Sequence, residues 1–285
     1  MTVPTIDHVI LTRFNLPSGG TEARIRASER WLVNRWDLFE RYCAPSVAAQ
    51  SNRNVSWIIY FDPESPEWLT TAVAPYAKQG LFTPFYRAEV PYDVLLADVR
   101  QVSTGSADML ITTNLDNDDG LAIDFVERLQ AAVDFTDRRA LYLINGLIKG
   151  PGGVYLRRDA DNAFCSVAEA WDQPKMCWAD WHLMLRRTMP VVEIDGAPGW
   201  LQVVHGENVS NRVRGRLTSP APWISRFPWA LVEAPQPGFG DLARDRIITS
   251  PLRWLRDTGR ATARRVAIAA LGKDGMQRLK ERLQR

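Results

Sequence analysis

Residues 108–121 read DMLITTNLDNDDGL, and this stretch decides the fold. It begins with an apolar run and ends with three clustered carboxylates, Asp116, Asp118 and Asp119, followed by a glycine. A short buried run that ends at a turn is typical of a central strand in an α/β sheet. Ligands of open α/β sheets bind beyond the carboxyl ends of such strands, so the three acids stand where a ligand is expected.

The three carboxylates repel one another, and a divalent cation is the usual compensation for such a cluster. Mg²⁺ prefers oxygen ligands and is typically bound by one or two carboxylates together with substrate phosphates. The stretch therefore predicts a site for a metal ion and a diphosphate. The alternative is a solvated turn, because Asp, Asn and Gly dominate turns in all proteins.

The segments before this stretch alternate between strands and helices. Apolar runs at residues 8–12, 56–62 and 81–86 predict three strands, and Pro84 places the last one at a sheet edge because proline cannot donate a backbone hydrogen bond. Apolar residues at helical spacing predict helices at residues 21–50, 66–79, 92–103 and 121–133. The alternation predicts an α/β fold with a central, mostly parallel mixed sheet flanked by helices.

The alternation ends near residue 137. Strands at residues 139–145 and 154–156 are predicted to form a hairpin around the turn Gly150-Pro-Gly-Gly153. The later predicted elements are short: strands at 164–167, 189–194 and 200–205, a helix at 178–185, and a loop over 212–240. The glycine spacing of P-loop and dinucleotide-binding motifs is absent, which argues against those phosphate-binding folds.

The composition of the 285 residues, with 46% hydrophobic and 24% charged residues, is that of an ordinary globular protein. No apolar run reaches eighteen residues, and the N-terminus lacks the pattern of a secretory signal, so we expect a cytoplasmic protein. Cys43, Cys165 and Cys177 have neither metal-ligand nor disulfide-framework spacing and are expected to be free thiols.

The net charge of +2 hides a basic C-terminal segment. Residues 244–285 carry twelve Arg and Lys against four Asp and Glu, a net charge of +8, so the preceding residues carry −6. We expect one α/β domain at 1–240 and a basic helical extension at 241–285. One hypothesis is that residues 244–285 lie on anionic lipid, peripherally on the inner membrane face. The alternative is that they form helices that pack on the domain with their arginines in solvent.

Several blocks of sequence resemble a bacterial rhamnosyltransferase family over residues 5–215. The matching blocks include HVILTRFN at 8–15, WIIYFD at 57–62, DNDD at 116–119, and spaced residues within 31–50 and 200–211. This family is similar to glycosyltransferases of the GT-A architecture. The resemblance therefore implies a GT-A-like nucleotide-sugar-binding domain with an acidic DxD-type metal motif after a central strand.

The resemblance also implies roles for the acidic residues. In GT-A enzymes the last acid of the motif usually contacts the metal, and the first often reaches the ribose. Asp118 and Asp119 are therefore the implied ligands of Mn²⁺ or Mg²⁺, and Asp116 is the implied contact to the ribose or the metal. His205 follows a short apolar strand, where many GT-A enzymes bring a histidine to the metal or diphosphate. Its alternative is a structural histidine.

Four further residues are candidates for binding the nucleotide donor. Arg13 and Asn15 follow the first strand, Asp62 follows the second, and Arg212 follows the last predicted strand. An arginine can pair with a phosphate, and a carboxylate can accept hydrogen bonds from a base or ribose. The alternative for Arg13 is a surface ion pair, and that for Asp62 is an ordinary turn at the strand end. The alternative for Arg212 is a solvated basic loop.

A transferase that inverts the anomeric centre also needs a general base near the acceptor hydroxyl. Asp180 is the candidate, because Trp178 and Trp181 could raise its pKa by desolvation and stack on a sugar. Glu169 and Asp172 are lesser candidates. The alternative for Asp180 is an acid in the first turn of an ordinary helix.

The leading hypothesis is a metal-dependent glycosyltransferase that moves a sugar, rhamnose by resemblance, from a dTDP-, UDP- or GDP-sugar to a glycan or lipid-linked acceptor. A nucleotidyltransferase is a second hypothesis, although the glycine-rich phosphate loop usual in that class is missing. A non-catalytic glycan-binding module is a third. The acidic cluster and the acidic body argue against a nucleic-acid partner.

Overall fold

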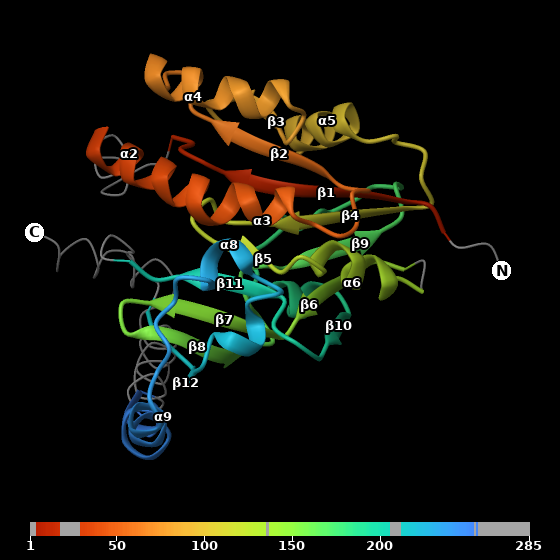
Figure 1. The fold of residues 1–285 in the computed structure, drawn as a ribbon. Helices are drawn as coiled ribbons and strands as arrows, with labels where there is room; N and C mark the ends of the chain where they lie inside the picture. Colours follow the sequence, from red (N-terminus) through yellow and green to blue (C-terminus); the bar gives the residue numbers. More distant parts are fainter. Residues whose placement is uncertain (1–3, 18–28, 135–136, 206–211, 254, 256–285) are drawn as a thin grey trace, which may run out of the picture.

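A seven-stranded mixed sheet forms the centre of the fold, with strand order β10-β6-β9-β4-β1-β2-β3 (Figure 1). The computed structural model describes residues 4–17, 29–134, 137–205, 212–253 and 255. The first four strands of the sheet are parallel: β1 (Ile6–Arg13), β2 (Ser56–Phe61), β3 (Thr83–Tyr86) and β4 (Met109–Asn114). The prediction of a mostly parallel sheet with the proline-containing strand at its edge is confirmed.

The other half of this sheet contains the antiparallel pairs. β9 (Ser166–Glu169) runs antiparallel between β4 and β6 (Arg139–Leu143), and β10 (Val191–Ile194) lies parallel to β6 at the edge. The sheet is therefore mixed, and β4, which leads to the acidic stretch, is one of its central strands.

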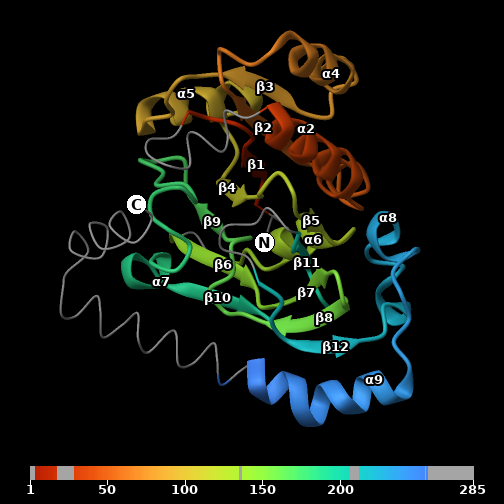
Figure 2. The same ribbon diagram turned by 90° about the vertical axis from the view of Figure 1, so that its left-hand side faces the viewer.

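Helices cover both faces of the sheet because successive residues of a strand point to opposite sides. Ile10 of β1 packs in the cluster that includes residues of α2 (Glu29–Leu38), α4 (Glu67–Lys78) and α6 (Phe125–Ala131). Its neighbours Val9 and Leu11 pack with residues of α5 (Tyr92–Val102) on the other face. Figure 2 shows α2 and α4 on one side of the sheet and α5 on the other.

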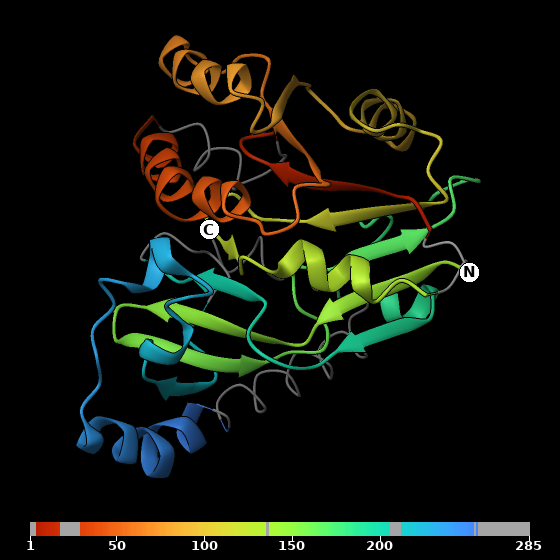
Figure 3. The ribbon, with the colours of Figure 1, turned by 45° about the vertical axis from the view of Figure 1, so that its right-hand side comes forward.

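A second, five-stranded sheet has the order β12-β8-β7-β11-β5. It lies below the strands β1, β2 and β4 in Figures 1 and 3. Its strands are β5 (Gly120–Leu121), β7 (Asn145–Gly150), β8 (Gly153–Arg158), β11 (Trp200–Val203) and β12 (Arg216–Thr218). The predicted turn at Gly150–Gly153 joins the hairpin β7–β8. Its predicted first strand, 139–145, is wrong, because residues 139–143 form β6 of the first sheet and β7 begins only at Asn145. The separate sheet was not predicted, because an alternating pattern does not specify which strands pair.

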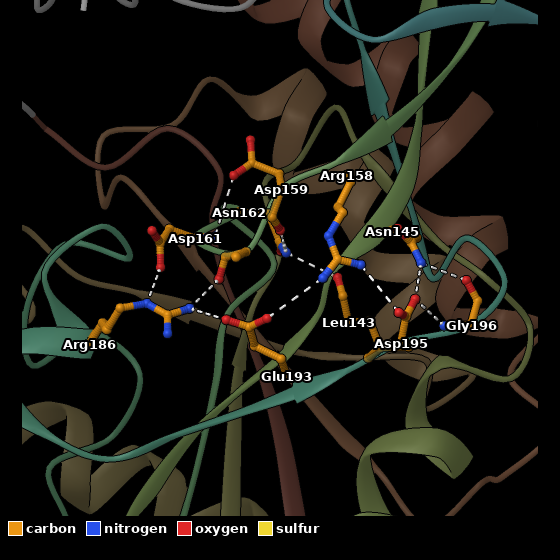
Figure 4. A network of polar contacts seen from close by, with 11 residues as sticks. Leu143, Asn145, Arg158, Asp159, Asp161, Asn162, Arg186, Glu193, Asp195 and Gly196 are labelled. Carbon is orange, nitrogen blue, oxygen red and sulfur yellow. Dashed lines mark hydrogen bonds and ion pairs between the residues drawn. The ribbon is translucent and has the colours of Figure 1, made fainter.

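An exposed network of charged side chains links the β7–β8 hairpin to β10 (Figure 4). Asn145 donates to Asp195 over 2.6 Å, Arg158 pairs with Asp195 at 3.2 Å, and Arg186 pairs with Glu193 at 2.8 Å. Exposed ion pairs contribute only about 0–1 kcal/mol each. The network thus orients the two sheets more than it stabilises the fold.

Two predicted elements differ from the structure. Residues 178–185 form turns, and the helix α7 (Leu185–Thr188) begins only at their end. The predicted loop over 212–240 contains short elements: β12, the 3₁₀ turn η2 (Ala221–Trp223), α8 (Pro228–Leu231) and the start of α9 (Phe239–Arg244). The first part of the predicted helix at 21–50, residues 21–28, lies outside the described residues, and so do residues 256–285 of the tail.

The remaining helical elements are the π-helical turn η1 (Phe39–Cys43), α3 (Ala44–Ala48), and η3 (Asp245–Thr249), which continues α9. None of the helices within the described ranges is long and apolar enough to cross a membrane. The three cysteines are buried and unpaired, as predicted.

Candidate active site

The acidic stretch connects the two sheets. Leu115 follows β4 and donates its N–H to Leu11 of β1 over 3.0 Å, and β5 then pairs antiparallel with β11. This pairing brings the residues after Val203 beside the aspartates. Gly120 is tightly enclosed, because an added Cβ would lie 3.1 Å from the carbonyl oxygen of Tyr42. The acids are therefore held between β4, η1 and β11.

Asp118 is 4% exposed and lies between two basic side chains. The guanidinium of Arg35, from α2, forms an ion pair with Asp118 Oδ2. His205 donates a hydrogen bond from Nε2 to the same oxygen over 3.1 Å. Burial raises the pKa of Asp118, but the bond from His205 and the charge of Arg35 outweigh it and hold the pKa below its ordinary value. Asp118 is therefore a charged, oriented carboxylate.

Asp119 is fully buried, with one satisfied carboxylate oxygen. Its Oδ1 accepts the N–H of Val203 over 2.8 Å, whereas its buried Oδ2 has no hydrogen-bond partner. Burial, followed by the negative charges of Asp118 and Asp116, raises the pKa of Asp119 well above its ordinary value. A cation beside Asp119 would remove this penalty.

The end of β1 holds the acidic stretch from the other side. Asn117 is buried and donates to the carbonyl oxygen of Phe14 over 2.7 Å. The Phe14 ring packs against Phe39 and Trp36, with centroid distances of 5.6 and 5.7 Å. Arg35 donates to Asn117 Oδ1 over 3.3 Å, so one guanidinium contacts two consecutive residues of the stretch.

Asp116 differs from its two neighbours because its side chain is exposed. Asn114 donates to Asp116 Oδ1 over 3.5 Å, and the thiol of Cys43 donates to the Asp116 carbonyl over 3.6 Å. Its carboxylate is thus accessible to a ligand, whereas Asp118 and Asp119 are buried behind it.

These residues fit a divalent cation that a substrate helps to bind. No group of three or more His, Cys, Asp or Glu within the described ranges is arranged to hold a metal by itself. The buried Asp119 oxygen without a partner, next to the charged Asp118, is the observation that favours a cation here. A site with two carboxylates suits Mg²⁺-type binding, in which phosphate oxygens complete the coordination.

A comparison with protein families matches residues 7–217 to the family described as "Putative rhamnosyl transferase". This chain belongs to that family. A rhamnosyl transferase is a glycosyltransferase, so the family match supports an enzyme over a non-catalytic binding module. None of the curated proteins compared with the sequence matches it.

Solved structures of glycosyltransferases are similar to this chain at low sequence identity. The S. aureus TarS structure has 11% identity and a TM-score of 0.43, over 70% of this chain and 37% of TarS. A shorter S. aureus TarS structure with UDP has 10% identity and a TM-score of 0.43, over 70% of this chain and 60% of that one. The structure of GalNAc-T7 with UDP, GalNAc and Mn²⁺ has 12% identity and a TM-score of 0.43, over 72% of this chain and 45% of GalNAc-T7. This chain thus spans less than two thirds of each.

The structure brings three of the predicted donor-binding residues to one edge of the sheet. Arg13 ends β1, and its guanidinium lies 4.0 Å from the ring centroid of Trp178. Asn15 accepts the N–H of Asp62 over 3.0 Å and donates to Ser65 over 3.1 Å. Asn15 therefore connects the ends of β1 and β2, and its amide has a structural role.

Arg212 is exposed, and no hydrogen bond or ion pair among the described residues joins it to the acidic stretch. Its role in donor binding remains a prediction. His205 is the last described residue before 206–211, so the later residues of the matching block at 200–211 lie outside the described chain.

Asp180 lies in a turn, and the prediction of a helix around it is wrong. Its Oδ1 accepts the N–H of Trp181 over 2.7 Å, a local bond that competes with helix formation. Trp178 donates to Asn114 at the end of β4 over 2.7 Å, which places the turn beside the acidic stretch. The side chains of Asp180 and Trp181 are both exposed to solvent.

Of the two lesser candidates for the base, Glu169 has a structural position. It is 1% exposed, forms an ion pair with Arg138 and accepts the N–H groups of Lys175 and Met176 over 2.8 and 2.7 Å. Asp172 is exposed. Glu169 therefore holds the segment that leads to Asp180 and is too enclosed to reach an acceptor.

Arg35 is the site residue that the sequence reasoning missed. It falls on the buried face of α2, because Trp31, Leu32, Arg35 and Trp36 follow helical spacing and the three apolar ones are buried. A charged residue on a buried helix face requires a partner of opposite charge, and this signal could have identified Arg35.

Proposed function

We propose that this protein transfers a sugar from a nucleoside-diphosphate donor with the aid of a divalent cation, Mn²⁺ or Mg²⁺, bound at Asp118 and Asp119. The observation that carries the proposal is the buried Asp119 oxygen without a hydrogen-bond partner, next to the charged Asp118. A protein that keeps such a costly arrangement gains stability when a cation binds, because an unsatisfied buried polar group costs about 1–3 kcal/mol.

Breaking the bond between a sugar and a diphosphate leaves negative charge on the phosphate oxygens. A divalent ion held by the two aspartates would act as a Lewis acid for this charge. Arg35 keeps Asp118 charged and oriented, and His205 supports the same oxygen from the side of β11. We assign Asp116, which is exposed beside them, to the donor ribose or to the metal, and Arg13 at the end of β1 to the phosphates.

The acceptor is assigned to the side of the site where Trp178 contacts both Arg13 and Asn114. Asp180 stands two residues further along, exposed to solvent, and is our candidate for the base that removes the proton from the acceptor hydroxyl. The exposed Trp181 beside it offers a flat apolar surface for a sugar ring. A carboxylate base on this side corresponds to inversion of the anomeric centre, and the acceptor is a glycan or a lipid-linked sugar.

Calorimetric titration of Mn²⁺ with dTDP, UDP or GDP tests the metal site. We expect tight nucleotide binding only in the presence of the metal, and a loss of at least tenfold in affinity for Asp118→Ala and Asp119→Ala. Asp93→Ala, which removes an exposed acid on α5, is the matched control and should bind as the wild type. Unchanged metal-dependent binding by both site variants would refute the metal assignment.

The sugar is tested separately from the metal. Hydrolysis of a panel of nucleotide sugars by the wild type should be fastest with a rhamnose donor such as dTDP-rhamnose, because the family description names rhamnosyl transfer. Preference for another sugar would show that the donor is not rhamnose, and it would not affect the assignment of the metal site.

A further inference from the structure

The last described helical segment exposes a row of apolar side chains. Figure 2 shows α9 on the outer side of the second sheet, beyond β12. Phe239 is 89% exposed and Ile247 is 74% exposed. The exposed apolar side chains of the segment, here called the apolar face, are Phe239, Ile247, Ile248, Leu252 and Leu255. Contiguous apolar surface on a soluble domain marks an interaction site.

Polar contacts hold the opposite side of this segment on the domain. Asp245 is 5% exposed and accepts the N–H of Leu217 in β12 over 2.8 Å. Thr249 donates to Asp245 over 2.6 Å, and Arg253 pairs with the same carboxylate while its guanidinium lies 5.0 Å from the ring centroid of Tyr155. The segment therefore docks on the domain through Asp245 and Arg253, and its apolar face points outward.

This arrangement is the reverse of what an ordinary surface helix shows. Such a helix buries its apolar stripe against the core and exposes its charges. Within residues 239–255 the segment packs on the domain through polar contacts and leaves its apolar face exposed. An exposed apolar face of this kind calls for a partner.

The charge of the segment indicates what that partner is. Arg244 and Arg246 are exposed on the same segment, and residues 256–285 carry nine more Arg and Lys against three acids. A second copy of the segment, or the chain's own downstream residues, would bring like charges together at the apolar face. A surface that is both negative and apolar complements it, and an anionic lipid bilayer has both properties.

We propose that residues 239–255 dock on an anionic lipid bilayer, with the apolar face at the acyl boundary and Arg244 and Arg246 at the headgroups. The Asp245–Arg253 contacts with the domain fix the angle at which the catalytic domain sits on the membrane. This inference goes beyond the proposed transferase activity and does not depend on it, because the segment and the acidic stretch share no residue.

Vesicle flotation of the full chain tests the proposal. The protein should float with vesicles of phosphatidylcholine and phosphatidylglycerol, remain in solution with phosphatidylcholine alone, and dissociate at about 1 M salt, where charges are screened within about 3 Å. The triple variant Phe239→Ser, Ile247→Ser, Ile248→Ser should lose at least tenfold in partitioning. Val232→Ser, which removes an apolar side chain that is 66% exposed outside the segment, should not.

Three results would overturn the proposal. Equal binding to neutral and anionic vesicles would show that the basic residues do not select the membrane. Flotation of the triple variant at the wild-type level would show that the apolar face does not bind the bilayer. A fall of the triple variant's Tm by several degrees, or a change from dimer to monomer in sedimentation, would show that another protein surface already covers the face. Binding of Mn²⁺ and nucleotide by the same variant should stay at the wild-type level.

Discussion

Replacing Asp119 by asparagine separates the stability of the fold from the function of the site. The carboxylate is fully buried, accepts the N–H of Val203 through Oδ1 and leaves Oδ2 without a partner. Asparagine has nearly the same shape and keeps the oxygen that accepts from Val203. It removes a negative charge that lies near Asp118 and Asp116. The free energy of unfolding in metal-free buffer should therefore rise in Asp119→Asn.

The expected size of this gain follows from the unsatisfied oxygen. A buried polar group without a partner costs about 1–3 kcal/mol, and asparagine retains part of that cost because its amide nitrogen also lacks a partner. We therefore expect Asp119→Asn to be more stable than the wild type by about 1 kcal/mol without metal, or about 2–4 °C in Tm. With Mn²⁺ and nucleotide at 100 times their dissociation constant, the wild type gains about 2.7 kcal/mol, and the variant gains none.

The pH dependence gives the same prediction an independent readout. Because the folded-state pKa of Asp119 is raised, folding costs nothing extra while the carboxyl is protonated in both states. The cost appears as the pH rises from about 4, the ordinary pKa of an aspartic acid, through the raised folded pKa. The stability advantage of Asp119→Asn should thus be present at pH 8 and disappear near pH 4.

Urea unfolding of both proteins at pH 4 and pH 8, each with EDTA or with Mn²⁺ and dTDP, measures the free energy of unfolding under all four conditions. At pH 8 with EDTA the variant should be more stable than the wild type. At pH 8 with Mn²⁺ and dTDP the variant should be less stable than the wild type. A variant that is less stable than the wild type in EDTA, or one that still gains stability from Mn²⁺ and nucleotide, would refute the reasoning.

Three further predictions concern other parts of the chain. Gly146→Ala should destabilise the second sheet by about 3 kcal/mol in urea unfolding, because its Cβ would lie 2.0 Å from the Trp200 ring, whereas Gly240→Ala, with open space around it, should not. Burial lowers the pKa of His8 to about 3, so the wild type should lose about 1.4 kcal/mol of stability per pH unit as the pH falls below 6.5, and His8→Gln should show a shallower slope. Asp180→Asn should lower kcat at least a hundredfold with unchanged donor affinity, and turnover near the wild-type level would move the base elsewhere.

The first half of the fold could be predicted because its signals are local. The apolar runs that became β1, β2 and β4 are buried on both sides, and the helices between them have one apolar face. The same locality made the acidic stretch visible, since a strand end and its turn are adjacent in sequence. The division of the chain at residue 240 stays a prediction.

The rest depends on contacts between distant residues. Nothing in residues 200–203 indicates that β11 pairs with both β5 and β7, a pairing that brings His205 to Asp118 across 87 positions. The turn around Asp180 was predicted as a helix because its apolar residues have helical spacing, while its local hydrogen bond to Trp181 is specific to the folded chain. Arg35 had a local signal, because it stands on an apolar helix face, but the carboxylate pattern of the acidic stretch does not point to it.

The central claim is that Asp118 and Asp119 hold a divalent cation that binds a nucleoside diphosphate. A crystal structure of the protein with Mn²⁺ and dTDP, with anomalous data at the manganese edge, tests it most directly. We expect one anomalous peak in contact with carboxylate oxygens of both residues and with the phosphates. Nucleotide bound without such a peak, or a peak at other residues, would contradict it.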